Sequence, residues 1–396
     1  MQELKQKRIE SIDIVRGLAM VLMALDHSRD YFHIGANIDD PLNLATTTPL
    51  LFFTRWITHF CAPIFIFLSG TSIYLQTLRK TKKELSSFLI KRGLWLVFVE
   101  LFIITLAWSF NPFYNVFFLQ VIWAIGISMV LMGLIIYLPY KYILVLGLLI
   151  VLGHNTFDRI EASSTFKHNI FLDLLHSSRF SFYEVFKNHF IVIAYPFLPW
   201  TGVMILGYCL GKLYSTDNEN KKRKKIILLM GIGLILLFIV LRWFNIYGDP
   251  QVWSFQKKSF FSFLSFINVH KYPPSLLYLC ITLGPSLIIL AVIENVKNRF
   301  SEVLKIFGRT AFFYYILHLY LIHFITAIFY FINGHTLKEI GDNNNSPFLF
   351  VVPGEGVTLL FVYLAWYIVV SLLYPLCKWY NFYKSNNKEK WWLSYL

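Results

Sequence analysis

Long apolar runs recur along the whole chain, and they constrain its fold more than any other feature. A run of roughly 18 residues or more with few charges can cross a bilayer as a helix. Of the 396 residues, 57% are hydrophobic and 15% are charged. No polar stretch is long enough to form a separate soluble domain. We therefore predict an all-α, polytopic helical membrane protein whose single domain covers residues 1–396.

The apolar runs divide the chain into about ten transmembrane helices. The predicted spans are 13–33, 51–78, 93–110, 116–138, 141–153, 190–214, 226–246, 273–293, 306–332 and 356–376. Basic residues cluster in alternate loops and in the tail 377–396, whereas the other loops are longer and contain fewer of them. Because cytoplasmic loops are enriched in Lys and Arg, we expect both termini in the cytoplasm.

The same distribution accounts for the formal net charge of +14. Basic residues confined to short loops are typical of membrane topology, so we expect no nucleic-acid partner. The four cysteines lie in or beside apolar spans without the spacing of a metal site, and we expect no metal. The sequence is compatible with a homo-oligomer but does not specify one.

The first predicted span contains ionisable residues, which are costly inside a membrane and are usually functional there. Arg16 and His27 are eleven residues apart, close to three helical turns, so their side chains share one face roughly 16 Å apart. A neutral imidazole can act as a general base or as an acyl carrier. Asp26 can pair with Arg29 or contact Asp30 at the next turn. The alternative is a helix-packing cluster whose charges satisfy one another.

The second predicted span carries Arg55 and His59, which are spaced i, i+4 and share a face. Pro63 lacks an N–H group, so the carbonyl of His59 loses its helical partner and the helix is expected to kink. This kink is a candidate wall of a polar cavity. The alternative is a structural kink with a packed histidine.

Basic residues recur where later spans meet the cytoplasm. Lys91 and Arg92 either anchor a helix at the lipid headgroups or bind a phosphorylated ligand. Arg309 lies near the cytoplasmic end of the ninth span. His318 lies near the middle of that span and either faces the same interior as His27 or packs between helices. The outer segments 154–189, 247–275 and 341–346 are candidates for the roof of an outward-facing site.

These residues resemble a known family. R-I-E-S-I-D-I-V-R-G-L-A-M-V-L-M, D-H-x-R-D-x-F-H, F-x-T-R-W-I-T-H-F-C-A-P and K-Y-P-P-S-L are similar to the bacterial branch of the heparan-α-glucosaminide N-acetyltransferase-like membrane proteins. The resemblance covers most of the chain and is strongest over residues 8–75. F-L-I-K-R and G-R-T-A-F-F-Y-Y-I-L-H, with the Arg16 to His27 spacing, are also similar to the wider membrane acyltransferase-3 group.

The resemblance implies a reaction in a bacterial cytoplasmic membrane. Acetyl-CoA binds from the cytoplasm, and a sugar or glycolipid on the outer side accepts the acetyl group. His27, Asp26 and His59 are the implied catalytic residues, with His27 as general base or transient acyl carrier and Asp26 or another carboxylate orienting it. The residues implied in binding CoA or substrate are Arg16, Arg29, Arg55, Lys91, Arg92, Arg309 and His318.

One position departs from the animal enzymes of this family. Their catalytic histidine lies in the outer loop, at a position that falls on Ile38 here, and His33 is the nearest histidine.

A second hypothesis is a transporter or permease whose intramembrane His, Asp and Arg side chains bind a substrate or relay protons.

Overall fold

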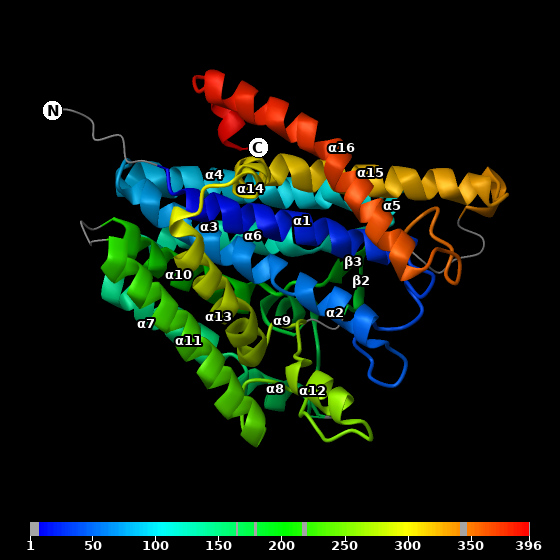
Figure 1. The fold of residues 1–396 in the computed structure, drawn as a ribbon, viewed down its shortest axis with the longest axis horizontal. Coiled ribbons are helices and arrows are strands. Elements are labelled where there is room, and N and C mark those ends of the chain that lie inside the picture. The colour runs from blue at the N-terminus through cyan, green and yellow to red at the C-terminus, as the bar shows by residue number, and fades with distance from the viewer. Residues whose placement is uncertain (1–7, 164, 178–179, 216–219, 341–346, 396) are drawn as a thin grey trace.

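The computed structural model describes residues 8–163, 165–177, 180–215, 220–340 and 347–395, and it is mostly helical (Figure 1). Helix α1 (Glu10–Phe32) lies at the centre and packs against α2 (Pro49–Thr58), α3 (Cys61–Thr77), α13 (Leu276–Val292), α14 (Arg299–Arg309), α15 (Ala311–Ile332) and α16 (Leu359–Asn386). The charged first span is therefore surrounded by protein rather than by lipid.

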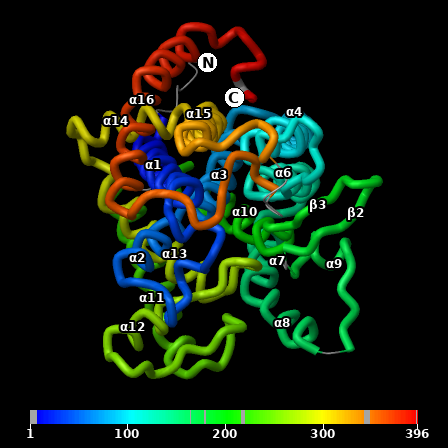
Figure 2. Tube along the Cα trace, turned by 90° about the vertical axis from the view of Figure 1, so that its right-hand side faces the viewer, coloured from blue at the N-terminus to red at the C-terminus, as the bar shows by residue number. Residues whose placement is uncertain are grey.

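A second group of helices packs beside this centre. It comprises α4 (Lys82–Val99), a π-helical turn (Glu100–Ile104), α5 (Thr105–Ser109), α6 (Val121–Ile135), α7 (Tyr140–Gly153), α10 (Phe197–Gly211) and α11 (Asn220–Phe244). Helix α10 joins the two groups, because it packs against α3, α6 and α7. Of the short helices, α8 (Thr156–Glu161) and α12 (Ser259–Ile267) lie near the bottom of Figure 2, and α9 (Ile170–Leu175) lies at its right.

Local sequence signals set several helix starts. Thr81 and Glu84 form a reciprocal capping box at the start of α4, each satisfying a backbone N–H at the helix end. Thr48 caps α2 immediately before Pro49, where a proline costs no helical hydrogen bond. Ser275 caps α13 in the same way.

The second predicted span is interrupted where we expected a kink. Helix α2 ends at Thr58 and α3 begins at Cys61, with Pro63 in its first turn. The freed carbonyl of His59 accepts a hydrogen bond from the Tyr278 hydroxyl at 2.7 Å. The interruption predicted from Pro63 is confirmed, and α13 supplies the missing donor.

The expectation of an all-α fold needs a correction. A small sheet has the order β1-β3-β2, with β1 (Val116–Leu119) parallel to β3 (His189–Ile193) and β2 (Phe182–Phe186) antiparallel to it. We had placed residues 116–119 and 190–193 inside spans. Short runs rich in Val, Ile and Phe suit a strand as well as a helix, so the apolar pattern alone could not separate them.

Six helices of the described chain are long and apolar enough to cross a membrane: Pro49–Thr77, Tyr140–Glu161, Asn220–Phe244, Leu276–Asn295, Ala311–Ile332 and Leu359–Asn386. Each coincides with a predicted span, which supports a polytopic helical membrane protein. The other four predicted spans correspond to the charged α1, to the α4–α5 helix, and to the shorter helices α6 and α10.

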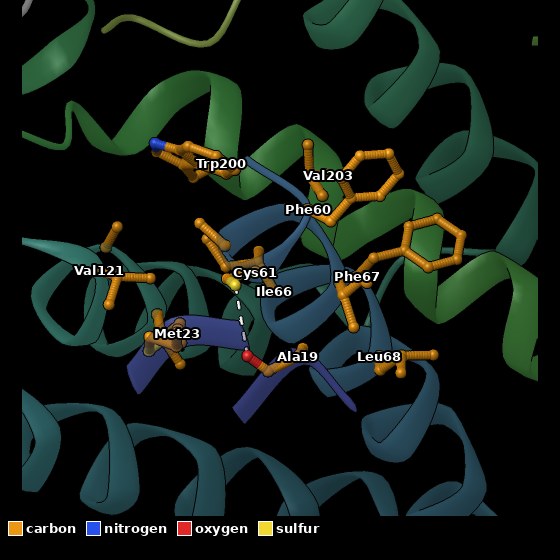
Figure 3. Packing of buried hydrophobic residues seen from close by; sticks show 14 of the residues in the cluster. Ala19, Met23, Phe60, Cys61, Ile66, Phe67, Leu68, Val121, Trp200 and Val203 are labelled. Atoms are coloured by element: carbon orange, nitrogen blue, oxygen red, sulfur yellow. Dashed lines mark hydrogen bonds between the residues drawn. The ribbon is translucent and has the colours of Figure 1, made fainter. Parts of the chain in front are cut away.

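Close helix crossings hold the centre together. A methyl group added to Gly17 would lie 1.9 Å from the carbonyl oxygen of Leu304, and one on Gly308 would lie 1.8 Å from that of Asp13. Small residues allow such backbone contact between α1 and α14. Between α1, α3 and α10 the packing is largely apolar, and the Cys61 thiol donates to the carbonyl of Ala19 at 3.3 Å (Figure 3).

Candidate functional site

A cavity of about 640 Å³ lies between α1, α3, α4, α6 and the α14–α15 junction. We call it the basic cavity, because six of its wall residues are cationic: Arg8, Arg16, Arg79, Arg92, Arg309 and Lys384. Among the described residues that line it, none carries a carboxylate. The cavity therefore suits a large anionic ligand.

Buried contacts fix three of these cations. Asp13 is 2% exposed and accepts from Arg8 Nε at 2.6 Å and from Arg309 Nε at 3.2 Å. Arg16 Nη2 donates to Ser72 Oγ at 3.0 Å. These contacts position the guanidinium groups before any ligand binds, which lowers the entropic cost of binding.

Three of the four residues predicted to bind phosphate line the basic cavity, and the fourth does not. Arg16, Arg92 and Arg309 all line the basic cavity, whereas Lys91 is exposed and is not one of its wall residues. Sequence reasoning missed Arg8, Arg79 and Lys384 as site residues. We had assigned them to cytoplasmic loops or to the tail, and only the packing of α1, α3 and α16 brings them to one cavity.

A second, smaller cavity of about 90 Å³ lies farther along α1. We call it the histidine cavity, and its polar wall residues are Asp26, His27, Asp30, Arg55, Thr58, Gln120, Tyr195, Lys271, Tyr272 and Tyr315. Met23, Val121 and Tyr315 line both cavities. The two cavities therefore adjoin across these three side chains.

The face predicted for the first helix is confirmed by these walls. Arg16, Met20 and Met23 line the basic cavity, and Met23 and His27 line the histidine cavity. Their spacing of four, three and four residues follows one face of a helix. One stripe of α1 thus passes from the basic cavity to the imidazole.

The His27 imidazole meets the imidazole of His318. His27 Nδ1 lies 2.7 Å from His318 Nε2, and the two rings are stacked with centroids 4.9 Å apart. Of the two interpretations left open for His318, the structure supports a shared interior with His27. Trp108 completes the surroundings with its ring centroid 4.8 Å from that of His27.

The hydrogen bonds assign the tautomers of the neutral pair. His318 Nδ1 lies 2.9 Å from the carbonyl oxygen of Tyr314, which can only accept, so Nδ1 carries the proton. His318 Nε2 is then an acceptor and His27 Nδ1 must donate to it. His27 Nε2 is left with its lone pair, and this is the nitrogen available to a substrate.

The residue that orients His27 differs from the one expected. The resemblance implies Asp26 or another carboxylate in this role, but the Asp26 carboxylate accepts from Arg29 at 2.9 Å and from Arg55 at 2.7 Å. Adjacent helical residues point about 100° apart, so Asp26 faces α2 while His27 faces α15. The predicted pairing of Asp26 with Arg29 is confirmed. Arg29 also donates to Asp30 at 2.5 Å.

His59 lies outside both cavities. Its ring is 1% exposed, stands edge-on to Tyr278 with centroids 5.4 Å apart, and lines neither cavity. Among the described residues, neither of its ring nitrogens has a hydrogen-bond partner. His33, nearest to the position of the catalytic histidine in the animal enzymes, follows the end of α1 and accepts from Gly35 N at 3.1 Å.

Sequence reasoning did not single out Lys271, Tyr272 and Tyr315 as site residues, although all three line the histidine cavity. Lys271 is 9% exposed, unusually buried for a lysine. Lys271 and Tyr272 belong to the outer segment 247–275, a predicted part of the roof, and both line the histidine cavity. Residues 341–346, also proposed for the roof, lie outside the described residues.

The helical fold and the long apolar helices define an integral-membrane protein, in which a basic cavity adjoins a smaller cavity lined by an imidazole. The family described as heparan-alpha-glucosaminide N-acetyltransferase, catalytic, matches residues 8–244. The chain belongs to this family, whose catalytic domain is that of a membrane acetyltransferase with acetyl-CoA as donor. A comparison with curated proteins gives no significant match.

Proposed function

We propose that this protein transfers an acetyl group from acetyl-CoA in the basic cavity to an acceptor that reaches the histidine cavity. The observation that carries the proposal is the contact between the two cavities at Met23, Val121 and Tyr315. CoA is a polyanion whose thioester lies at the end of a flexible arm. The cationic walls suit its phosphates, and the arm can then extend along α1 towards His27.

In this proposal His27 Nε2 supplies the base. The acceptor oxygen or nitrogen attacks the thioester carbonyl as His27 takes its proton, the C–S bond breaks, and the CoA thiolate then takes up a proton. Alternatively, Nε2 itself attacks and carries the acetyl group before the acceptor receives it. Lys271, Tyr272 and Tyr315 provide donors in the same cavity for the negative charge that develops on the carbonyl oxygen.

The acceptor is proposed to be a sugar or a glycolipid headgroup of a bacterial envelope, approaching from the side opposite to the basic cavity. Both termini would then be cytoplasmic, and the ten predicted spans would include α1, the α4–α5 helix, α6 and α10. Arg55 lines the histidine cavity and stays a candidate for acceptor binding, whereas His59 and Arg29 line neither cavity and would support the site from outside it.

The test uses purified full-length protein in proteoliposomes, with radiolabelled acetyl-CoA and a panel of amino sugars and glycolipids. His27→Ala is expected to lower turnover by roughly 10²–10⁴, the usual contribution of a general base, while acetyl-CoA still binds. His59→Ala tests the second predicted histidine. Unchanged turnover in His27→Ala would exclude the assigned base.

Binding of the donor is tested with adjacent residues. Arg92→Ala is expected to weaken acetyl-CoA binding roughly tenfold or more, the value of one charge-assisted hydrogen bond. Lys91→Ala is the matched control, because Lys91 is exposed outside the cavity. Equal affinities in the two variants would contradict CoA binding in this cavity.

The transporter hypothesis uses the same two cavities as parts of a substrate route. It predicts uptake of a solute into proteoliposomes and no acetyl transfer to any acceptor. Thermal stabilisation of the protein by acetyl-CoA favours the enzyme, whereas stabilisation only by small ions or sugars favours transport.

A further inference from the structure

A second cluster of chemically active side chains lies away from both cavities, where α7, α8 and α9 meet. Asp158 and Glu161 are three residues apart on α8, so both carboxylates lie on one side of that helix. His176 follows the last residue of α9. Its Nδ1 lies 2.8 Å from Glu161 Oε1, and one ligand atom from each of the three residues lies within 4.8 Å of the other two.

We propose that Asp158, Glu161 and His176 bind a divalent transition-metal ion, for which zinc is the probe of choice. One imidazole nitrogen and two carboxylate oxygens are ligands that Zn²⁺ accepts, with water in the fourth position. Zinc–ligand bonds of about 2.0–2.2 Å place ligand atoms roughly 3–3.5 Å apart, so side-chain rotations close the site. Binding replaces the contact between His176 Nδ1 and Glu161 Oε1 with a bond from each of these atoms to the metal.

Neighbouring residues already support two of the three ligands. Asn155 Nδ2 donates to Asp158 Oδ2 at 2.7 Å, and the Asn155 amide oxygen accepts from the backbone N–H of Leu276 at 2.8 Å. His154 Nδ1 lies 3.1 Å from His176 Nε2. With metal on Nδ1, His176 Nε2 carries a proton and donates it to His154, the outer contact that metal-bound histidines usually make.

Burial favours a site of this kind over an exposed ion pair. His154 and His176 are each 2% exposed, and Glu161 has a side chain only 12% exposed. Few water molecules can therefore compete with the protein ligands. The site lies within residues 158–176 and uses none of the groups proposed for acetyl transfer, so it stands independently of that function.

The metal would fasten α8 to the end of α9, from which the chain runs through β2 and β3 to Tyr195. Tyr195 and Tyr272 both line the histidine cavity and meet with ring centroids 5.5 Å apart. Phe180, soon after His176, meets Tyr272 at 5.0 Å. The bound metal ion would thus stiffen the outer wall of the histidine cavity.

The experiment measures metal directly. Full-length protein in detergent is stripped with a chelator, incubated with Zn²⁺ and desalted, and its metal content is determined by plasma mass spectrometry. The wild type is expected to retain about one ion per chain and to show a thermal midpoint that rises with Zn²⁺ and falls again with EDTA. A wild type that retains no zinc, or whose midpoint ignores both treatments, overturns the proposal.

Variants identify the ligands. Glu161→Gln and His176→Ala are expected to lose the retained ion, and His154→Ala to weaken zinc binding roughly 10- to 100-fold, as for other outer-sphere partners. His189→Ala is the control, since His189 belongs to the same outer segment but is not one of the three proposed ligands, and its Nδ1 lies 2.8 Å from the Lys187 carbonyl oxygen. Stripped proteins are compared by size-exclusion elution, so that misfolded variants are recognised. Retention of zinc by a folded Glu161→Gln, His176→Ala double variant overturns the assignment.

Discussion

At the scale of single residues, His318 determines what His27 can do. The chain of contacts from the Tyr314 carbonyl through His318 to His27 leaves a lone pair on one nitrogen of His27. In the proposed reaction His318 is therefore a positioning residue, because it would select the tautomer of His27 without touching the substrate.

His318→Gln and His318→Phe test this role. A glutamine amide can still accept from His27 Nδ1, whereas a phenylalanine cannot. We expect His318→Phe to lower kcat by roughly tenfold or more with little change in the KM for acetyl-CoA, and His318→Gln to restore part of the rate. Steady-state kinetics of both variants measure the difference, and equal rates in the two would contradict a tautomer-selecting role.

The sequence predicted part of this site. Helical spacing alone placed Arg16 and His27 on one face, because that relation lies within a single helix. The partner of His27 is 291 residues away, and no local pattern could choose His318 over His59. No local pattern could place Lys271 in the site either, because its position depends on how the segment before α13 folds.

At the scale of elements, the crossing of α1 and α14 brings two helix backbones into contact beside the site. Gly308→Ala is expected to destabilise the protein by about 1–3 kcal/mol or more, because the added methyl meets backbone rather than a movable side chain. Gly233→Ala on α11 is the control, since a methyl there meets nothing within 4 Å. Thermal midpoints in detergent compare the two, and similar midpoints would show that the crossing can relax.

The connection between α15 and α16 contains a pH-dependent contact. Hydrogen bonds to Glu355 and Glu339 raise the pKa of His335 above its ordinary value. A raised folded-state pKa means that the contact stabilises fully below about pH 6.5 and is lost as the pH rises through the folded-state value. Hydrogen exchange of residues 331–340 should therefore be faster in His335→Gln than in the wild type at acidic pH. A difference that persists unchanged at alkaline pH would contradict this.

The long helices were predicted better than the short strands. The six long apolar helices can be predicted from hydropathy, because an apolar run of bilayer length is typical of a transmembrane helix. The strands β1 and β3 were assigned to spans, because a four- or five-residue apolar run carries too little periodicity to separate strand from helix. Their pairing also joins segments more than 70 residues apart.

At the scale of the whole molecule, both ends of the described chain meet at the basic cavity. Arg8 and Lys384 are both wall residues of that cavity, while the loop after α1 lies at the other end of that helix. This supports an even number of membrane crossings.

Cysteine labelling tests the topology. The four native cysteines are buried, which keeps the background low. Ser385→Cys, near the end of α16, and Asp39→Cys, in the loop after α1, are both exposed positions. We expect a membrane-impermeant maleimide added to intact cells to label Asp39→Cys, and to label Ser385→Cys only after the cells are opened. Labelling of both in intact cells would contradict the proposed topology.

The wall shared by the two cavities has a consequence for the cell as well as for chemistry. If the cavities face opposite compartments, Met23, Val121 and Tyr315 are the barrier against proton leakage at this point of the membrane. A flexible methionine suits such a barrier, because it can yield to a pantetheine arm and then close again. Met23→Gly should therefore dissipate a pH gradient across proteoliposomes faster than the wild type, and added CoA should slow the leak by filling the opening. If the pH gradient decays as slowly with Met23→Gly as with the wild type, the barrier to protons lies elsewhere in the protein.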